Sequence, residues 1–231
     1  MEFELFETSI DAVMRFTVDT KLTAAGWVRL PAQRYQMLLG PRKQSTCSLE
    51  VSVRKENLVP CDPRSEQSAR IAPLCVLAVD LVASSGDGEK GVARNSHPSA
   101  RDQICCVSLA VAKHGTWERK RCLVLTLGPT EKIRSVGDAV EVKCFHSERD
   151  LLRALWRAVV HEIDPDVVVT FQGNLLGAVL DRASSLGAGQ CRCLGRIQDE
   201  ESVMRSVKGA MEPFMTGRVF MNLQAEIQAR S

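Results

Sequence analysis

Several features that commonly reveal a protein's function are scarce in this sequence. The net charge is only +2 over 231 residues, so the composition gives no sign of a nucleic-acid-binding surface. The longest apolar runs, at residues 74–79 and 167–171, are far too short to span a bilayer. The N-terminus is acidic where a secretory signal would be basic. We therefore expect an intracellular protein with no membrane partner.

The nine cysteines lack the spacing of a metal site. No Cys-x-x-Cys pair occurs, and the pair Cys191 and Cys193 offers only two ligands. Cys75, Cys105 and Cys106 lie inside apolar runs, where a thiol behaves as a small hydrophobic group. We expect reduced structural thiols rather than zinc ligands or disulfides.

The composition is that of an ordinary globular protein. The apolar fraction is 45% and the charged fraction is 25%, which allows a substantial core. The segment 56–68 is polar, contains two prolines and separates two apolar regions, which favours a boundary there. We predict two domains, at residues 1–68 and 69–231, with a long polar loop at residues 84–101.

Apolar runs and one helical stripe predict the elements of the second domain. Ser147, with Asp150 three residues later, resembles the start of a helix, and Asp164-Pro165-Asp166 would end it. A helix is also predicted at residues 175–186, and buried strands are predicted at residues 74–82, 104–112, 122–127 and 167–171. Strands followed by a helix, a strand and a helix form an α/β layered sheet, the plan of ribonuclease-H-like nucleases. That plan alone proves no function.

Several stretches carry a resemblance to a known family. They fall, in order along the chain, at residues 13–20, 26–31, 71–80, 148–152, 164–167, 180–183, 194–196 and 217–219. Together they resemble the N-terminal and 3′–5′ exonuclease region of family B DNA polymerases of the delta type. The resemblance implies a ribonuclease-H-like exonuclease sheet with flanking helices, truncated, after a partial β-rich N-terminal module: α/β in class, α+β overall.

The same resemblance implies a setting for the protein. It points to DNA replication and proofreading, to a nuclear location, and to weak DNA binding or contacts with replication-complex proteins. The chain contains no counterpart of the polymerase palm, fingers and thumb, so we do not expect it to synthesise DNA.

The exonuclease reaction of this family needs carboxylates that are scarce here. Two divalent ions about 4 Å apart activate water and stabilise the leaving oxygen, and Mg²⁺ prefers hard oxygen ligands. By resemblance, Asp80 keeps one ligand position, whereas Val82 stands where the family has a Glu. The second motif, at residues 171–177 and ending in Gly177, contains no carboxylate. Asn222 also stands where the family usually has Asp. We predict an inactive site that needs no cofactor, with Mg²⁺ required only for residual activity.

Other readings of the chain remain open. Asp87 and Glu89 could replace lost ligands, which would make the protein an active exonuclease with relocated ligands. The chain could also be a protein-interaction scaffold, or a gene fragment without independent activity.

Basic and aromatic residues offer a weaker signal for DNA binding. Arg119, Lys120 and Arg121 lie between two predicted strands and could contact phosphates. The alternative is a solvated hairpin turn, which we favour. Trp27 and Tyr35 could stack on bases, although aromatic residues make up only 5% of the chain and serve more often as packing anchors.

Overall fold

The computed structural model describes residues 10–23, 25–66, 68–84, 101–116, 119–131, 140–171, 174–207 and 209–229. By their contacts, the described residues form two compact units, one within 1–43 and 48–72 and the other within 44–47 and 73–231. The predicted domains 1–68 and 69–231 stay a prediction. The contacts change over at residues 72–73, and the short segment 44–47 belongs with the second unit.

The first unit consists of short elements. They are α1 (Ala12–Thr20), β1 (Val28–Arg29), β2 (Tyr35–Met37), η1 (Gly40–Arg42), β3 (Val51–Val53), η2 (Lys55–Asn57) and β4 (Val59–Pro60). The Asp11 carboxylate begins α1 by accepting hydrogen bonds from two backbone amides of its first turn. Strands β1 and β4 pair antiparallel, as do β2 and β3. None of the described residues of this unit is buried.

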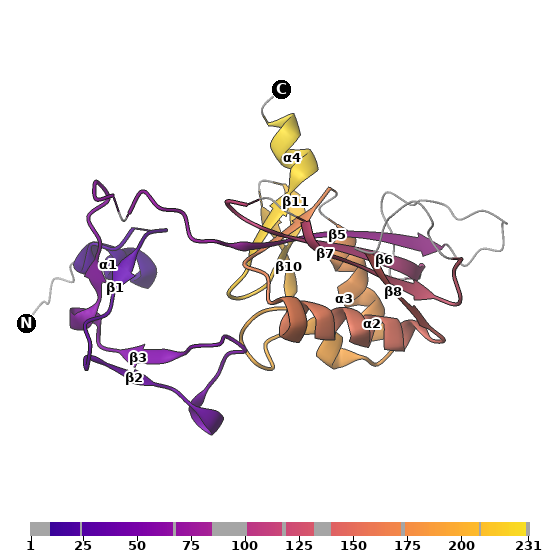
Figure 1. The fold of residues 1–231 in the computed structure, drawn as a ribbon, viewed down its shortest axis with the longest axis horizontal. Coiled ribbons are helices and arrows are strands. Elements are labelled where there is room, and N and C mark those ends of the chain that lie inside the picture. Colours follow the sequence, from indigo (N-terminus) through magenta and orange to yellow (C-terminus); the bar gives the residue numbers. More distant parts are fainter. Residues whose placement is uncertain are drawn as a thin grey trace, which may run out of the picture. The chain divides into compact units, whose positions relative to one another are not determined.

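A six-stranded mixed sheet organises the second unit (Figure 1). In spatial order its strands are β12 (Val219–Asn222), β9 (Val167–Thr170), β5 (Cys75–Ser84), β6 (Gln103–Lys113), β7 (Arg119–Leu127) and β8 (Val140–Phe145). The pairs β5–β6 and β6–β7 are antiparallel, whereas β12–β9, β9–β5 and β7–β8 are parallel. The predicted mixed α/β class, with a central sheet and flanking helices, is confirmed.

Two helices pack on one face of this sheet. They are α2 (Glu148–Arg157), which continues as the π-helical turn η3 (Ala158–Ile163), and α3 (Leu175–Ser185). Both lie on the same side of the strands, and α4 (Leu223–Gln228) extends on the other side (Figure 1). The remaining elements are η4 (Gly189–Arg192) and the antiparallel hairpin β10 (Val203–Val207) and β11 (Ala210–Phe214).

The predicted start and end of α2 are confirmed. The Ser147 hydroxyl accepts a hydrogen bond from the Asp150 amide at 3.1 Å and donates to the Asp150 carboxylate at 2.6 Å. The helical run ends at Ile163, and Asp164 follows in the left-handed region with φ 46°. Aspartate tolerates this conformation, and Pro165 prevents the helix from continuing.

The core fills the space between the sheet and the two helices. Alternate strand residues such as Leu77, Leu125 and Val168 meet helix residues such as Leu155 and Val179, each 2% exposed or less. A β-bulge between Val82 and Ala83 interrupts the β5–β6 register. We call the side of the sheet on which α2 and α3 pack the covered face.

None of the helices in the described part of the chain combines the length and apolar character that crossing a bilayer requires. All nine cysteines are free thiols.

Candidate functional site

The predicted ligand Asp80 lies on the side of the sheet that faces away from α2 and α3. We call this side the open face. Because side chains alternate along a strand, its residues are the strand positions between those of the covered face. Among the residues of the four central strands whose side chains the structure describes, they are Val76, Ala78, Asp80, Val82, Cys106, Ser108, Ala110, Ala112, Cys122, Val124, Thr126, Val167 and Val169.

Asp80 is the single charged residue in that set. Its side chain is exposed, and one carboxylate oxygen accepts a hydrogen bond from the Leu81 amide at 2.9 Å. Its partner across the antiparallel pair β5–β6 is Ser108, and Val82 pairs with Cys106. Asp80 is therefore flanked along and across the strands by small, apolar or uncharged groups.

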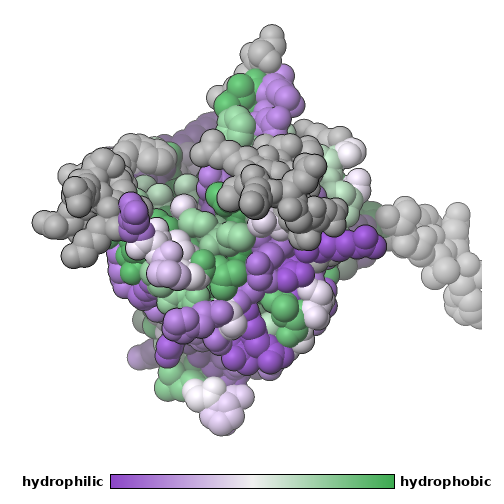
Figure 2. All heavy atoms as spheres, turned by 90° about the vertical axis from the view of Figure 1, so that its right-hand side faces the viewer, coloured by the Kyte–Doolittle hydropathy of each residue, from purple (hydrophilic) through white to green (hydrophobic). Residues whose placement is uncertain are grey.

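A shallow cavity of about 440 Å³ lies over this part of the open face. Its lining residues are Ala78, Val79, Asp80, Ser108, Leu109, Ala110, Cys122, Val124, Val140, Val169, Thr170, Phe171 and Leu223. Figure 2 looks at the end of the second unit and not onto the open face; hydrophobic residues gather in the middle of that end, with hydrophilic residues around them.

A pair of divalent ions does not fit this set of side chains. A two-metal site needs several converging oxygen ligands, and Val82 has no oxygen in its side chain. The nearby thiol of Cys106 is a poor substitute, because burial, together with the charge of Asp80, raises its pKa and keeps it protonated. Across the described residues, no three His, Cys, Asp or Glu side chains gather closely enough to hold a metal ion.

The second sequence motif offers no ligand at Gly177. This glycine lies in the first turn of α3, where a Cβ atom would stand 2.6 Å from Oδ1 of Asn174 and 3.2 Å from the Met204 side chain. Both neighbours are the ends of flexible side chains, which would have to shift to admit a larger residue. Residues 172 and 173 of the motif lie outside the described residues, as do the candidate substitutes Asp87 and Glu89.

Asn222 has a structural role that the sequence did not suggest. Its side-chain oxygen accepts hydrogen bonds from the amides of Gln224 and Ala225, at 3.1 and 3.3 Å, and so caps α4. The position at which the family usually has Asp therefore stabilises a helix start in this chain.

The predicted basic residues lie in a strand and not in a hairpin turn. Strand β7 begins at Arg119, because the antiparallel pairing with β6 continues past the apolar run, to the pairs Val111–Arg121 and Ala112–Arg119. Hydrogen bonds from the Arg121 guanidinium to Glu141, at 2.8 Å, and to Glu162, at 3.2 Å, raise its pKa and neutralise much of its charge. Its role in DNA binding stays a prediction, as do those of Arg119 and Lys120, whose side chains are not described.

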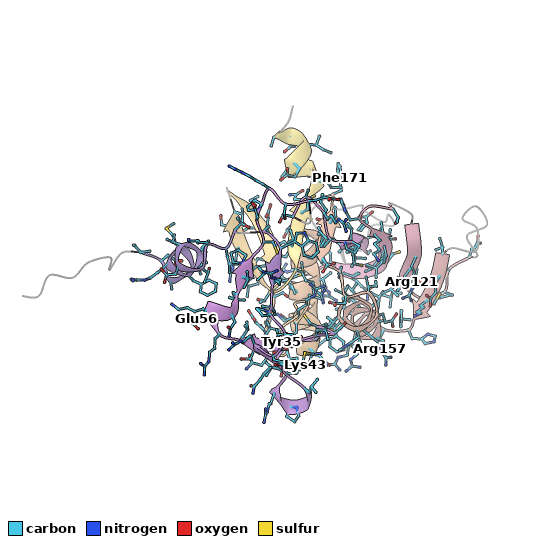
Figure 3. The ribbon with its side chains drawn as sticks, turned by 60° about the vertical axis from the view of Figure 1, so that its left-hand side comes forward. Tyr35, Lys43, Glu56, Arg121, Arg157 and Phe171 are labelled. Atoms are coloured by element: carbon cyan, nitrogen blue, oxygen red, sulfur yellow. The ribbon has the colours of Figure 1, made fainter. Side chains whose placement is uncertain are left out.

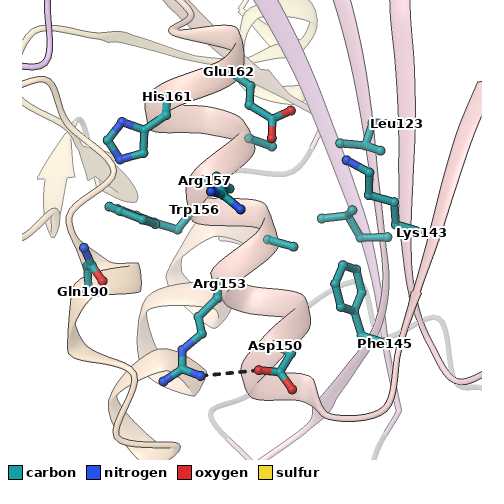
Figure 4. A pocket seen from close by; sticks show the side chains of 13 residues that line it. Leu123, Lys143, Phe145, Asp150, Arg153, Trp156, Arg157, His161, Glu162 and Gln190 are labelled. Carbon is teal, nitrogen blue, oxygen red and sulfur yellow. Dashed lines mark hydrogen bonds and ion pairs between the residues drawn. The ribbon is translucent and has the colours of Figure 1, made fainter.

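A second cavity, of about 550 Å³, lies beside α2 on the covered side (Figure 4). Arg157 stands over it, between the Trp156 ring and the strand residues Leu123 and Lys143 (Figure 4). No ion pair of Arg157 is found among the described residues, whereas Lys143 contacts Glu141 at 3.0 Å. Figure 3 shows Arg157 and Arg121 among the side chains of this unit. Sequence reasoning missed this cavity, because β8 was not predicted.

Comparisons with known proteins show which family the chain is similar to. Residues 3–231 match the family model described as DNA polymerase family B, exonuclease domain. The chain is 32% identical over 219 residues to the DNA polymerase delta catalytic subunit of Bos taurus, covering 94% of this chain and 18% of that protein. It is 31% identical to the same subunit of Caenorhabditis elegans, covering 87% of this chain and 18% of that protein. The chain thus spans about a fifth of the length of these relatives.

Proposed function

This chain belongs to the exonuclease domain family of the family B DNA polymerases, and we propose that it is a member that does not hydrolyse DNA. The observation that carries the proposal is the isolation of Asp80 on the open face, with Val82 two residues along the same face. One carboxylate cannot hold two Mg²⁺ ions at the spacing that phosphodiester hydrolysis requires. The second motif supports the same proposal, because residues 171–177 contain no carboxylate.

A nuclease assay tests this proposal. Purified protein is incubated with a 3′-labelled mismatched primer–template and Mg²⁺ or Mn²⁺, and we expect no shortening of the primer. Cleavage that Asp80→Ala abolishes would refute the proposal. Cleavage that Asp87→Asn or Glu89→Gln abolishes would instead identify relocated ligands.

A gain-of-ligand variant sharpens the test. Val82→Glu places a second carboxylate on the open face, two residues from Asp80. We expect Mn²⁺ binding, measured by titration with paramagnetic resonance detection, to be stronger in Val82→Glu than in the natural chain. Val124→Glu, on β7, which β6 separates from the strand of Asp80, is the matched control and should bind Mn²⁺ no better than the natural chain.

We further propose that the protein acts alongside DNA replication in the nucleus by binding rather than by cleavage. The relatives that carry this inference are named DNA polymerase delta catalytic subunits. The matched region is an exonuclease domain, so DNA synthesis is not proposed for these 231 residues.

Direct DNA binding, if present, should be weak and electrostatic, because the net charge is only +2 and Arg121 is paired with two carboxylates. A mobility-shift titration with single-stranded DNA and primer–template at low salt measures it. The double variant Arg119→Ala and Lys120→Ala should weaken any shift more than Arg54→Ala and Arg64→Ala, which remove the same charge from the first unit. The absence of a shift at micromolar protein would exclude DNA as a partner.

A further inference from the structure

A short segment at residues 44–47, which we call the strap, lies against the loop at residues 196–198 of the second unit. Two backbone hydrogen bonds of 2.8 Å join them, one from the Thr46 amide to the Arg196 carbonyl and one from the Gln198 amide to the strap. The Gln198 side chain also donates to a backbone carbonyl of the strap, at 3.3 Å. The strap is thus attached to the loop along its whole length.

Hydrogen bonds, rather than apolar contacts, hold the strap in place. Its sequence is Gln-Ser-Thr-Cys, which contains no large apolar side chain. None of these four residues belongs to the hydrophobic core of the described part of the chain. A hydrogen bond contributes little net free energy, because water replaces it when a segment opens. Segments with few buried apolar contacts open more readily than a core, so the strap should open more readily than the sheet.

The loop beneath the strap is fixed from its other side. The Arg196 guanidinium donates to the carboxylates of Asp164, at 2.9 Å, and Asp166, at 2.8 Å. The Arg196 amide donates to the Thr216 carbonyl at 2.7 Å. At Gly195, a Cβ atom would stand only 2.9 Å from the same carbonyl oxygen, so the two backbone segments are in close contact. An opening should therefore move the strap and leave the loop where it is.

The strap forms part of the wall of a third cavity, of about 510 Å³, within the second unit. Thr46 lines this cavity from the strap, and Cys193, which is half-buried, lines it as well. The Trp156 and His161 side chains line both this cavity and the one beside α2 (Figure 4). Displacing one wall of a cavity exposes the groups on the other walls, so an open strap should make the Cys193 thiol more accessible.

We propose that the strap opens locally while the sheet stays folded, and that this opening controls access to the third cavity and to the Cys193 thiol. The residues on both sides of the strap belong, by their contacts, to the first unit. The strap can therefore leave the loop without separating any strands of the six-stranded sheet. This inference does not depend on whether the chain hydrolyses DNA.

Amide hydrogen exchange tests the local opening. The Thr46 amide should exchange at least about tenfold faster than the paired amides of β5 and β6, because fewer contacts must break to expose it. Low concentrations of urea should leave the exchange of Thr46 unchanged, because a local opening exposes little surface, and should accelerate exchange in the strands. Exchange of Thr46 with the rate and urea dependence of β5 would overturn the inference.

A disulfide across the strap tests the control of access. Ser45 and Ile197 form an antiparallel pair whose hydrogen bonds come from the flanking residues, the arrangement that brings two side chains closest together. Ser45→Cys with Ile197→Cys should therefore form a disulfide on oxidation, and Cys47→Ser is included so that no neighbouring thiol competes. Alkylation of Cys193, measured by mass spectrometry of its peptide, should be at least about fivefold slower in the oxidised than in the reduced form.

A variant that weakens the strap should have the opposite effect. Thr46→Pro removes the amide that donates to the loop and should accelerate the alkylation of Cys193, whereas Thr46→Ser keeps both donors and should not. Cys191 is the internal control, because it is 1% exposed and is not among the residues that line the cavity.

Two results of these alkylation experiments would overturn the inference. The first is an unchanged rate at Cys193 in both the oxidised chain and Thr46→Pro. The second is a rapid reaction of Cys191 together with Cys193 in Thr46→Pro, because the strap would then be needed for the fold itself and could not open on its own.

Discussion

The two faces of the six-stranded sheet come from alternate residues of the same strands, yet they differ in burial, packing and charge. On the covered face, Leu77 and Leu125 are fully buried beneath α2 and α3. On the open face, the neighbouring residue Ala78 is exposed, and Asp80 has no ion pair among the residues that the structure describes. Substitutions on the covered face should therefore cost more folding free energy than substitutions on the open face.

The largest expected difference is in the free energy of unfolding that is lost when either of two carboxylates, one on each side of the sheet, is removed. Glu148 is 5% exposed, accepts a hydrogen bond from the Ile104 amide at 2.9 Å and is bonded to Arg182. Glu148→Ala removes the buried carboxylate that Arg182 contacts and should lower the free energy of unfolding by about 4 kcal/mol. Asp80→Ala should change it by no more than about 0.5 kcal/mol. Urea unfolding followed by circular dichroism measures both.

A double variant separates the loss of the pair from the loss of packing. Glu148→Leu with Arg182→Met replaces both charges by apolar groups and should recover most of the stability that Glu148→Ala loses. Equal destabilisation by Asp80→Ala and Glu148→Ala would contradict the distinction between the two faces.

The next largest difference in stability is expected between substitutions of two adjacent residues of β7. Leu125 is fully buried on the covered face, whereas Val124 lies on the open face. Leu125→Ala should lower the free energy of unfolding by about 3 kcal/mol, because it leaves a cavity in the core. Val124→Ala truncates a half-buried side chain that lines the open-face cavity and should cost less than about 1 kcal/mol. Similar thermal unfolding midpoints for the two variants would contradict the expectation that Val124 is less tightly packed than Leu125.

The smallest expected effect is a pH dependence of the stability that arises from Asp164, the residue after η3. Burial alone would raise the pKa of Asp164, but hydrogen bonds from Arg196 and Arg218, at 2.9 and 2.8 Å, hold it below the ordinary value of 3.8. A lowered pKa means that Asp164 contributes stability above pH 3.8 and loses it as the pH falls towards its folded pKa. The contribution is modest, because the Asp164 side chain is 34% exposed.

Unfolding midpoints at pH values from 7 down to 3 measure this dependence. Asp164→Asn should flatten the decline below pH 4 relative to the natural chain. An unchanged decline in Asp164→Asn would contradict this assignment.

The elements that could be predicted from the sequence are those with an apolar periodicity of their own. The strands at residues 74–82 and 104–112 and the helix after Ser147 agree with β5, β6 and α2 to within a few residues, because their apolar periodicity reflects burial. The Ser147 cap was predictable because its bonds are local. The ligand position Asp80 could be named from its motif, but not its isolation, which depends on strands far apart in sequence.

The elements that the sequence did not reveal depend on tertiary contacts. Strand β8 (Val-Glu-Val-Lys-Cys-Phe) has charged residues at two alternate positions and is ordered by its parallel pairing with β7. Strand β12 is only four residues long and pairs with β9. Arg121 appeared to be a solvated turn residue because its partners, Glu141 and Glu162, come from β8 and η3. Local patterns carry no information about such partners.

The order of the strands also determines how the chain must fold. Strands β5, β6 and β7 follow one another as antiparallel neighbours and can form from local collisions. Strand β9 must find β5 by pairing Val167 with Val76, and β12 must then add to β9. Such long loop closures are slow, and until β9 arrives one edge of β5 has unpaired amides and carbonyls. Newly made chains are therefore most at risk of aggregation during this interval, when a chaperone would have most to protect.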